Sequence, residues 1–117
     1  MKENIIFDKS YLFALRIIKF HDFLYKEKRE RVLSKQLLRC GTSIAAQISE
    51  STYAQSRADF ISKLNIALKE ANETRYWIRL LFDSNYISET MFHSIYPEIE
   101  EIIKILTTII KKTKNNY

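Results

Sequence analysis

The sequence predicts an all-α protein with the fold of an antiparallel up-down four-helix bundle. Gly41 is the only glycine and Pro97 the only proline in 117 residues, whereas sandwiches and barrels need many tight turns that recruit these residue types. Four long segments repeat apolar residues at helical spacing. Because short connections between long amphipathic helices make neighbours antiparallel, residues 1–117 are expected to form one such bundle.

The first helix is expected over about residues 8–26. Phe7 before Asp8 has the pattern of a hydrophobic staple followed by an N-cap, which predicts the start of the helix. Among the residues expected to face the core are Leu12, Leu15, Ile18 and Phe23. The charged stretch at residues 26–31 is expected to form the first connection.

The second helix is expected over about residues 32–52. Leu37, Gly41, Ile44 and Ile48 follow the four-three-four spacing of a buried stripe. A glycine inside a helix costs about 1 kcal/mol relative to alanine, so Gly41 indicates the close approach of a neighbouring helix. An alternative architecture has three helices, with the second and third continuous through Tyr53.

The third helix is expected over about residues 56–83, and it opens with Ser56 and Asp59 in the arrangement of a capping box. Its buried stripe is expected to comprise Phe60, Leu64, Ala67, Ala71, Thr74, Ile78 and Leu81. The fourth helix is expected over about residues 88–113, around Ile95, Ile99, Ile102, Leu106 and Ile109. Pro97 falls inside it, so residues 88–96 form either a separate turn or a kinked first part.

Catalysis and metal binding find little support, and we expect no enzyme activity, no cofactor and no metal. Cys40 lies among small apolar residues, where a packing cysteine is usual, and the chain lacks a glycine-rich phosphate loop. Glu70 and Glu73 resemble part of a di-iron motif, but neither histidine stands in the required Glu-x-x-His frame. We expect both carboxylates to form ion pairs across helices with Arg39.

The single cysteine favours a reducing compartment, and we expect a cytoplasmic protein. The apolar stretch near the N-terminus is too short for a signal peptide, and no apolar run approaches membrane-spanning length. A membrane-surface role would depend on basic residues such as Lys111 and Lys112, which a helix dipole explains more simply. We therefore expect no membrane partner.

Basic residues concentrate in one part of the chain. Eight of them lie between positions 16 and 39 against three acidic residues, so this stretch has a net charge of +5, equal to that of the whole chain. Such a strip is typical of proteins that bind the phosphate backbone of nucleic acids. The simpler alternative is a solvated helix face. The predicted nucleic-acid-binding residues are Arg16, Lys19, Lys26, Lys28, Arg29, Arg31, Lys35 and Arg39.

Aromatic residues suggest a second contact surface. Trp77 shares a stripe of the third helix with Ile66, Glu70 and Glu73, away from the predicted buried stripe. Such an aromatic residue either covers the edge of the core or meets another subunit. Two apolar faces on one helix favour self-association, so Tyr76 and Trp77 are the predicted oligomer interface.

Several stretches in order resemble one known family: residues 32–39 (VLSKQLLR), 41–44 (GTSI) leading to Glu50, 54–60 (AQSRADF), 67–74 (ALKEANET), and Tyr76-Trp77. The family comprises four-helix-bundle proteins encoded within intervening sequences of bacterial large-subunit rRNA genes. Ala45 and Gln47 depart mildly from its pattern, which often has glycine and asparagine there. The resemblance implies an up-down bundle without catalytic activity that assembles into a ring, pentameric in the relatives compared. The chain is also similar to accessory proteins of diversity-generating retroelements, which bind nucleic acid and a reverse transcriptase.

Two functional hypotheses follow. The first is a non-enzymatic, homo-oligomeric protein that binds nucleic acid, with RNA favoured over DNA, through backbone contacts of the basic strip. The second is a structural or adaptor protein whose partner is another protein, such as a reverse transcriptase, bound through the Tyr76–Trp77 surface.

Overall fold

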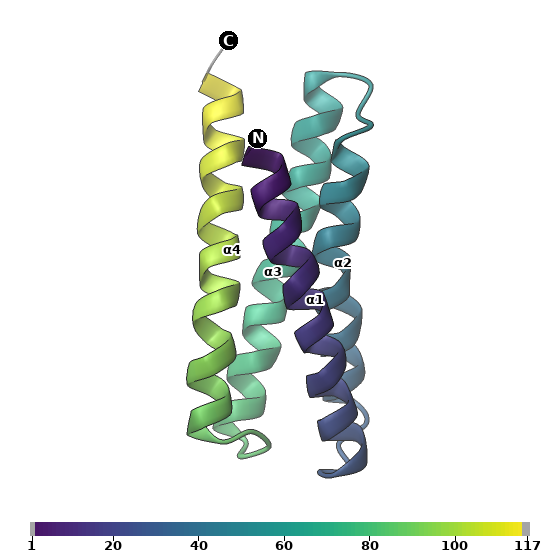
Figure 1. Ribbon diagram of the computed structural model, residues 1–117, viewed down its shortest axis with the longest axis vertical. Helices are drawn as coiled ribbons and strands as arrows, with labels where there is room; N and C mark the ends of the chain where they lie inside the picture. Colours follow the sequence, from purple (N-terminus) through teal and green to yellow (C-terminus); the bar gives the residue numbers. More distant parts are fainter. Residues whose placement is uncertain (1, 116–117) are drawn as a thin grey trace.

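The computed structural model describes residues 2–115, with their side chains from residue 5, as four helices in up-down order, which confirms the predicted fold class (Figure 1). The helices are α1 (Lys2–Lys26), α2 (Leu33–Ser51), α3 (Arg57–Asp83) and α4 (Glu89–Asn115). Each packs against the next, and α4 returns to α1, while helices at opposite corners make no close backbone contact. The bundle measures 49 × 21 × 19 Å.

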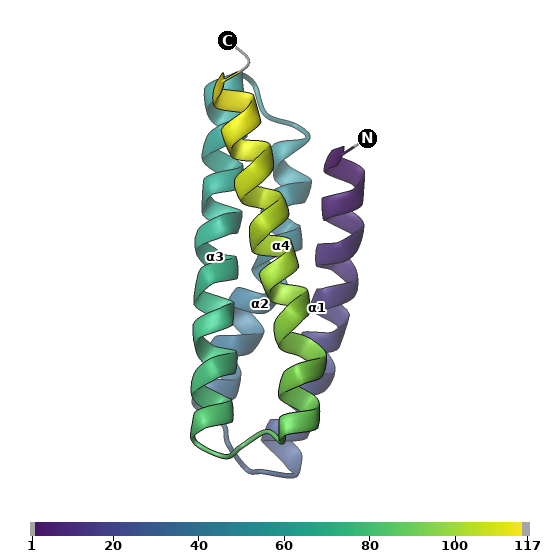
Figure 2. The same ribbon diagram turned by 90° about the vertical axis from the view of Figure 1, so that its left-hand side faces the viewer.

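The two ends of the bundle differ in what they carry. The α1–α2 and α3–α4 connections lie at one end, whereas the start of α1, the α2–α3 connection and the end of α4 lie at the other (Figures 1 and 2). A break in the helix between α2 and α3 shows that the three-helix alternative is wrong. Ser56 has extended backbone there, and its hydroxyl accepts a hydrogen bond from the Asp59 amide at 3.0 Å, which starts α3 anew.

The predicted start of α1 is wrong, and so is the inward orientation predicted for three of its four named apolar residues. The helix begins at Lys2, so Asp8 lies inside it and Phe7 is no staple. Leu12, Leu15 and Ile18 are 63, 44 and 44% exposed. Phe23 is half-buried and packs against the core. The stripe that faces the core instead comprises Ile6, Phe13, Ile17, Phe20 and Leu24. Two apolar stripes run along α1, and the one containing two phenylalanines packs inward.

The buried stripe of α2 agrees with the prediction, and Gly41 explains why α1 lies so close. A β-carbon at Gly41 would lie 2.9 Å from both Cγ1 and Cγ2 of Ile17, nearer than real β-carbons come to other atoms. The absence of a side chain at Gly41 therefore allows α1 and α2 to approach each other. This close approach is what the helical glycine indicated.

The predicted stripes of α3 and α4 are also confirmed, with Phe60 only partly buried. The Asp59 carboxylate accepts a hydrogen bond from the Gln55 amide at 3.1 Å. In a standard capping box this reciprocal bond would come from the amide of the N-cap residue, which here is Ser56. α4 runs unbroken through the exposed Pro97, which excludes a separate turn at residues 88–96. Within residues 2–115, none of the helices combines the length and the apolar character needed to cross a membrane.

Candidate nucleic-acid interface

Five of the eight predicted nucleic-acid-binding residues gather at the end of the bundle where α1 leads into α2. All five are exposed, and none of them forms an ion pair with a carboxylate of the described residues. We call this surface the basic end: Lys26, Lys28, Arg29, Arg31 and Lys35. Its charge is therefore not neutralised by direct contacts within the bundle.

A buried glutamate holds the connection that carries these residues. Glu30 is only 8% exposed, and its carboxylate accepts hydrogen bonds from the amides of Val32, Leu33 and Ser34 at 3.1, 3.0 and 2.7 Å. The Ser34 hydroxyl donates in return to the Glu30 carbonyl at 2.6 Å. The amino end of a helix attracts anions, but here the Glu30 carboxylate already fills that position. The chain's own carboxylate therefore occupies the amino end of α2, and the exposed cations of the connection are its lysine and arginine side chains.

Aromatic rings position two of the basic side chains. The Arg31 guanidinium lies over the Tyr25 ring, 4.5 Å from its centroid, and the Lys28 ammonium lies 5.8 Å from the centroid of Phe23. Cation–π contacts of this kind hold a cation near a ring without cancelling its charge. Lys28 also lines a shallow pocket beside Asp83 and Glu89, so its surroundings are less positive than those of the other four.

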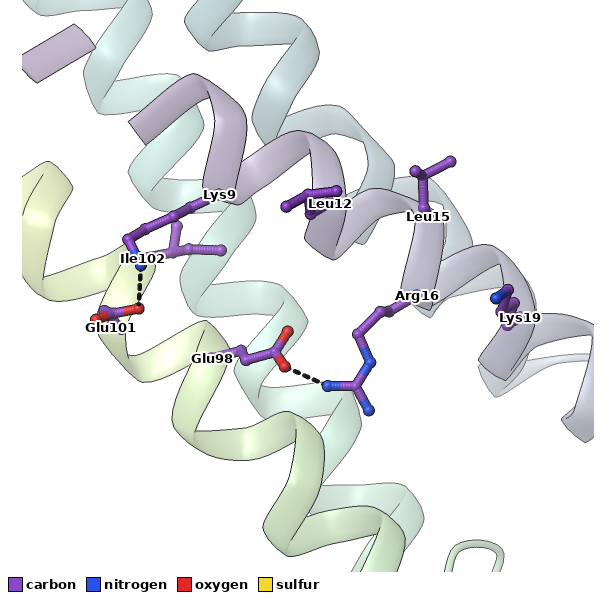
Figure 3. A pocket seen from close by; sticks show the side chains of 8 residues that line it. All are labelled: Lys9, Leu12, Leu15, Arg16, Lys19, Glu98, Glu101 and Ile102. Atoms are coloured by element: carbon purple, nitrogen blue, oxygen red, sulfur yellow. Dashed lines mark hydrogen bonds and ion pairs between the residues drawn. The ribbon is translucent and has the colours of Figure 1, made fainter. Parts of the chain in front are cut away.

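The remaining three predicted residues lie outside the basic end. Arg16 reaches across to α4, where it forms an ion pair with Glu98 (Figure 3). It also donates a hydrogen bond to the Ser94 carbonyl at 3.2 Å. Arg39 forms ion pairs with Glu70, at 3.4 Å, and with Glu73 on α3. Lys19 is exposed partway along α1. Arg16 and Arg39 thus bridge neighbouring helices, and their charge is offset by carboxylates.

The two residues of the Tyr76–Trp77 surface differ in exposure. Tyr76 is 57% exposed, whereas Trp77 is half-buried and packs against the core. Their rings meet edge to face with centroids 5.0 Å apart. The Trp77 indole donates to the Glu73 carboxylate at 3.2 Å, which ties it to the Arg39 ion pair. Tyr76 is therefore the residue of this surface that a partner can reach.

The structure bears on two features that could support chemistry, the Cys40 thiol and clusters of metal ligands. Burial raises the pKa of the Cys40 thiol to about 11, so the reactive thiolate is scarce at neutral pH. No group of three potential metal ligands occurs within residues 2–115.

An open groove between α1 and α4 is the feature that sequence reasoning missed. Lys9 and Arg16 cross it to Glu101 and Glu98 (Figure 3). Leu12 and Leu15, which were expected in the core, line it on the α1 side. α1 and α4 contact each other less than any other neighbouring pair, which leaves this side of the bundle open.

The fold and the basic end together define a small four-helix bundle with a positively charged surface. The chain belongs to the 23S rRNA-intervening sequence protein family, whose model matches residues 2–108. It is similar to a crystal structure of a protein of unknown function from the S23 ribosomal protein family of Bacteroides thetaiotaomicron. The two are 56% identical, the match covers 95% of this chain and 99% of that one, and the TM-score is 0.92. None of the curated proteins matches this chain.

Proposed function

We propose that this protein is a non-enzymatic, homo-oligomeric RNA-binding protein of the cytoplasm, and that the basic end contacts RNA phosphates. The observation that carries the proposal is the gathering of five exposed cations, without carboxylate partners among the described residues, at one end of the bundle. RNA is favoured over DNA because members of this family are encoded within rRNA genes. The helix arrangement is a plain bundle, so phosphate contacts rather than base readout supply the affinity.

Salt dependence gives the quantitative expectation. Each phosphate neutralised by a lysine or arginine contributes about −0.7 to −0.9 to the slope of log affinity against log salt. Five such contacts predict a slope of about −4, so raising salt from 50 to 200 mM should weaken binding by roughly two orders of magnitude. Homo-oligomer formation would place several basic ends on one particle and raise the avidity further.

Neutralising part of the basic end tests the assignment. The triple variant Lys26→Gln, Arg31→Gln and Lys35→Gln is expected to reduce the magnitude of the salt slope by about 2 to 3 and to bind RNA far more weakly at low salt. Fluorescence anisotropy with a labelled fragment of 23S rRNA, titrated at several salt concentrations, measures both quantities.

A matched variant removes three charges from the other end of the bundle. Lys104, Lys111 and Lys114 lie exposed along α4, and changing them to glutamine alters net charge equally. This control is expected to retain most of the affinity and slope. Equal loss in both variants, or wild-type affinity that ignores salt, would contradict an RNA site at the basic end.

Self-association through the Tyr76–Trp77 surface is the second part of the proposal. The family resemblance implies a ring, with five as the expected subunit number. Tyr76→Glu is expected to reduce the assembly measured by light scattering, because it places a charge on an apolar contact. Trp77 makes a poorer probe, since its packing against the core would mix unfolding with loss of assembly. An unchanged mass after Tyr76→Glu would argue against this contact.

The exposure of Tyr76 also favours a second candidate function, that of an adaptor for another protein. The resemblance to retroelement accessory proteins suggests a reverse transcriptase as that partner. Loss of partner binding in Tyr76→Glu with an intact oligomer would favour the adaptor over self-association at this surface.

A further inference from the structure

Tyr25 brings an exposed aromatic ring into the basic end. It lies in the last turn of α1, directly before Lys26, and it is 43% exposed. The other exposed tyrosines of residues 5–115 are Tyr11, Tyr53 and Tyr76, and all three lie outside the basic end. Tyr25 is therefore the exposed ring that a molecule held by the cations of the basic end can reach.

The neighbours of Tyr25 hold its ring in place without covering it. The Arg31 guanidinium lies over the ring, 4.5 Å from its centroid. The His21 ring is tilted by 38° against the Tyr25 ring, with the two centroids 5.6 Å apart. Aromatic rings and arginine guanidinium planes are the groups on which proteins stack unpaired bases of RNA. Tyr25 and Arg31 together thus offer a stacking surface inside a cluster of cations.

The charge beside the ring distinguishes Tyr25 from the aromatic pair on α3. There the Trp77 indole donates to the Glu73 carboxylate at 3.2 Å, and the nearby Arg39 is already paired with that carboxylate. A carboxylate next to a ring repels the phosphates that flank a stacked base. The Arg31 guanidinium attracts them instead, because it has no carboxylate partner among the described residues.

Stacking on Tyr25 requires a base that is not paired. In a duplex the bases are enclosed in the helix, and the deep, narrow major groove of A-form RNA keeps side chains away from them. Phosphate contacts by themselves give no preference for single strands, because a duplex has the higher charge density. A preference for unpaired RNA is therefore the property that separates stacking from simple charge attraction.

We propose that the basic end binds single-stranded RNA, with one unpaired base stacked on Tyr25 and Arg31 while the surrounding cations contact the flanking phosphates. This inference rests on the proposed RNA-binding function and adds the form of RNA that is bound. Stacking accepts every base, because each has a flat aromatic face. The site therefore selects unpaired segments, such as loops, bulges and ends of a folded RNA, without selecting their sequence.

Three ligands test the stacked base. They are an oligouridine, an abasic strand with the same number of phosphates, and the same oligouridine paired with oligoadenosine. The oligouridine is expected to bind about tenfold more tightly than the abasic strand, which keeps the phosphate charge but has no base to stack. It is also expected to bind more tightly than the duplex, although the duplex has the higher charge density. Fluorescence anisotropy at a single salt concentration measures all three affinities.

Variants of Tyr25 assign the difference to its ring. Tyr25→Leu keeps an apolar side chain without the ring and is expected to abolish the tenfold advantage of oligouridine, while binding of the abasic strand stays nearly unchanged. Tyr25→Phe keeps the ring and is expected to preserve the advantage. The matched control is Tyr53→Leu, because Tyr53 is 84% exposed in the α2–α3 connection at the opposite end of the bundle (Figure 1). Circular dichroism confirms that each variant folds.

Failure of RNA binding and failure of stacking give different results. If none of the ligands binds in a salt-dependent manner, the RNA-binding function is wrong and the stacked base is overturned with it. If all three bind with steep salt dependence but the abasic strand matches oligouridine, the basic end contacts phosphates only and stacking alone is overturned. Equal losses for oligouridine and the abasic strand in Tyr25→Leu would show that the ring merely positions Arg31, which also overturns stacking.

Discussion

Replacing Glu30 with alanine is expected to lower the free energy of unfolding by about 2–3 kcal/mol. The carboxylate accepts three backbone hydrogen bonds, from Val32 just before α2 and from the first two residues of that helix, and its charge favours the amino end of the helix. Its removal leaves these amides without their acceptors, including that of the buried Ser34. The change should also loosen the connection that positions Arg29 and Arg31. Urea denaturation followed by circular dichroism measures the loss.

Two comparison variants separate capping from charge. Glu27 lies in the same connection, is exposed and forms no ion pair among the described residues, so Glu27→Ala should change stability by less than about 0.5 kcal/mol. Glu30→Gln keeps an oxygen acceptor without the charge and is expected to fall between Glu30→Ala and wild type. If the Glu30→Ala and Glu27→Ala variants had the same free energy of unfolding, the Glu30 cap would contribute nothing to stability.

The role of Glu30 illustrates why the site was only partly predictable. In the sequence Glu30 counts as one of three acids opposing a basic strip. Its capping position depends on the backbone around it, where Arg29 adopts the left-handed conformation (φ 53°) and the Glu30 amide bonds to the Leu24 carbonyl at 2.9 Å. The sequence does not announce either feature. Arginine rarely adopts positive φ, so nothing about Arg29 predicts its left-handed backbone.

The ion pairs show a different limit. The pairing of Arg39 with Glu70 and Glu73 could be anticipated, because the charges lie on helices expected to be adjacent. The pairing of Arg16 with Glu98 could not, since it depends on the relative rotation of α1 and α4. Counting charges along the chain located the basic region, and only the packing shows which cations already have carboxylate partners.

The helices themselves were predictable wherever one face was clearly apolar. α2, α3 and α4 each have a single dominant stripe, and their buried residues agree with the spacing. α1 has two, and periodicity alone cannot choose between stripes on opposite sides of one helix. In the stripe that packs inward, Ile17 lies directly against Gly41. That contact joins residues of two helices and has no signature within α1.

Gly41→Val is expected to lower the free energy of unfolding by about 3 kcal/mol, the upper part of the usual range for overpacking a core. Any β-carbon at this position meets Ile17 at 2.9 Å, and both side chains are β-branched and stiff. Gly41→Ala should cost less, because alanine gains about 1 kcal/mol of helix propensity over glycine and so offsets part of the clash. Denaturant unfolding of both variants measures their free energies of unfolding and shows which substitution costs more.

A double-mutant cycle with Ile17→Ala assigns the cost to this one contact. Ile17→Ala removes the two Cγ atoms that the new side chain meets, so Gly41→Val should cost at least about 1 kcal/mol less in that background than in wild type. Ala46→Val, on the exposed face of α2, measures the cost of valine in this helix without a clash. Additive effects of Gly41→Val and Ile17→Ala would mean that the glycine is needed elsewhere in the packing. Strong coupling would establish that the contact between Gly41 and Ile17 sets the distance between α1 and α2, and with it the face that α1 leaves exposed.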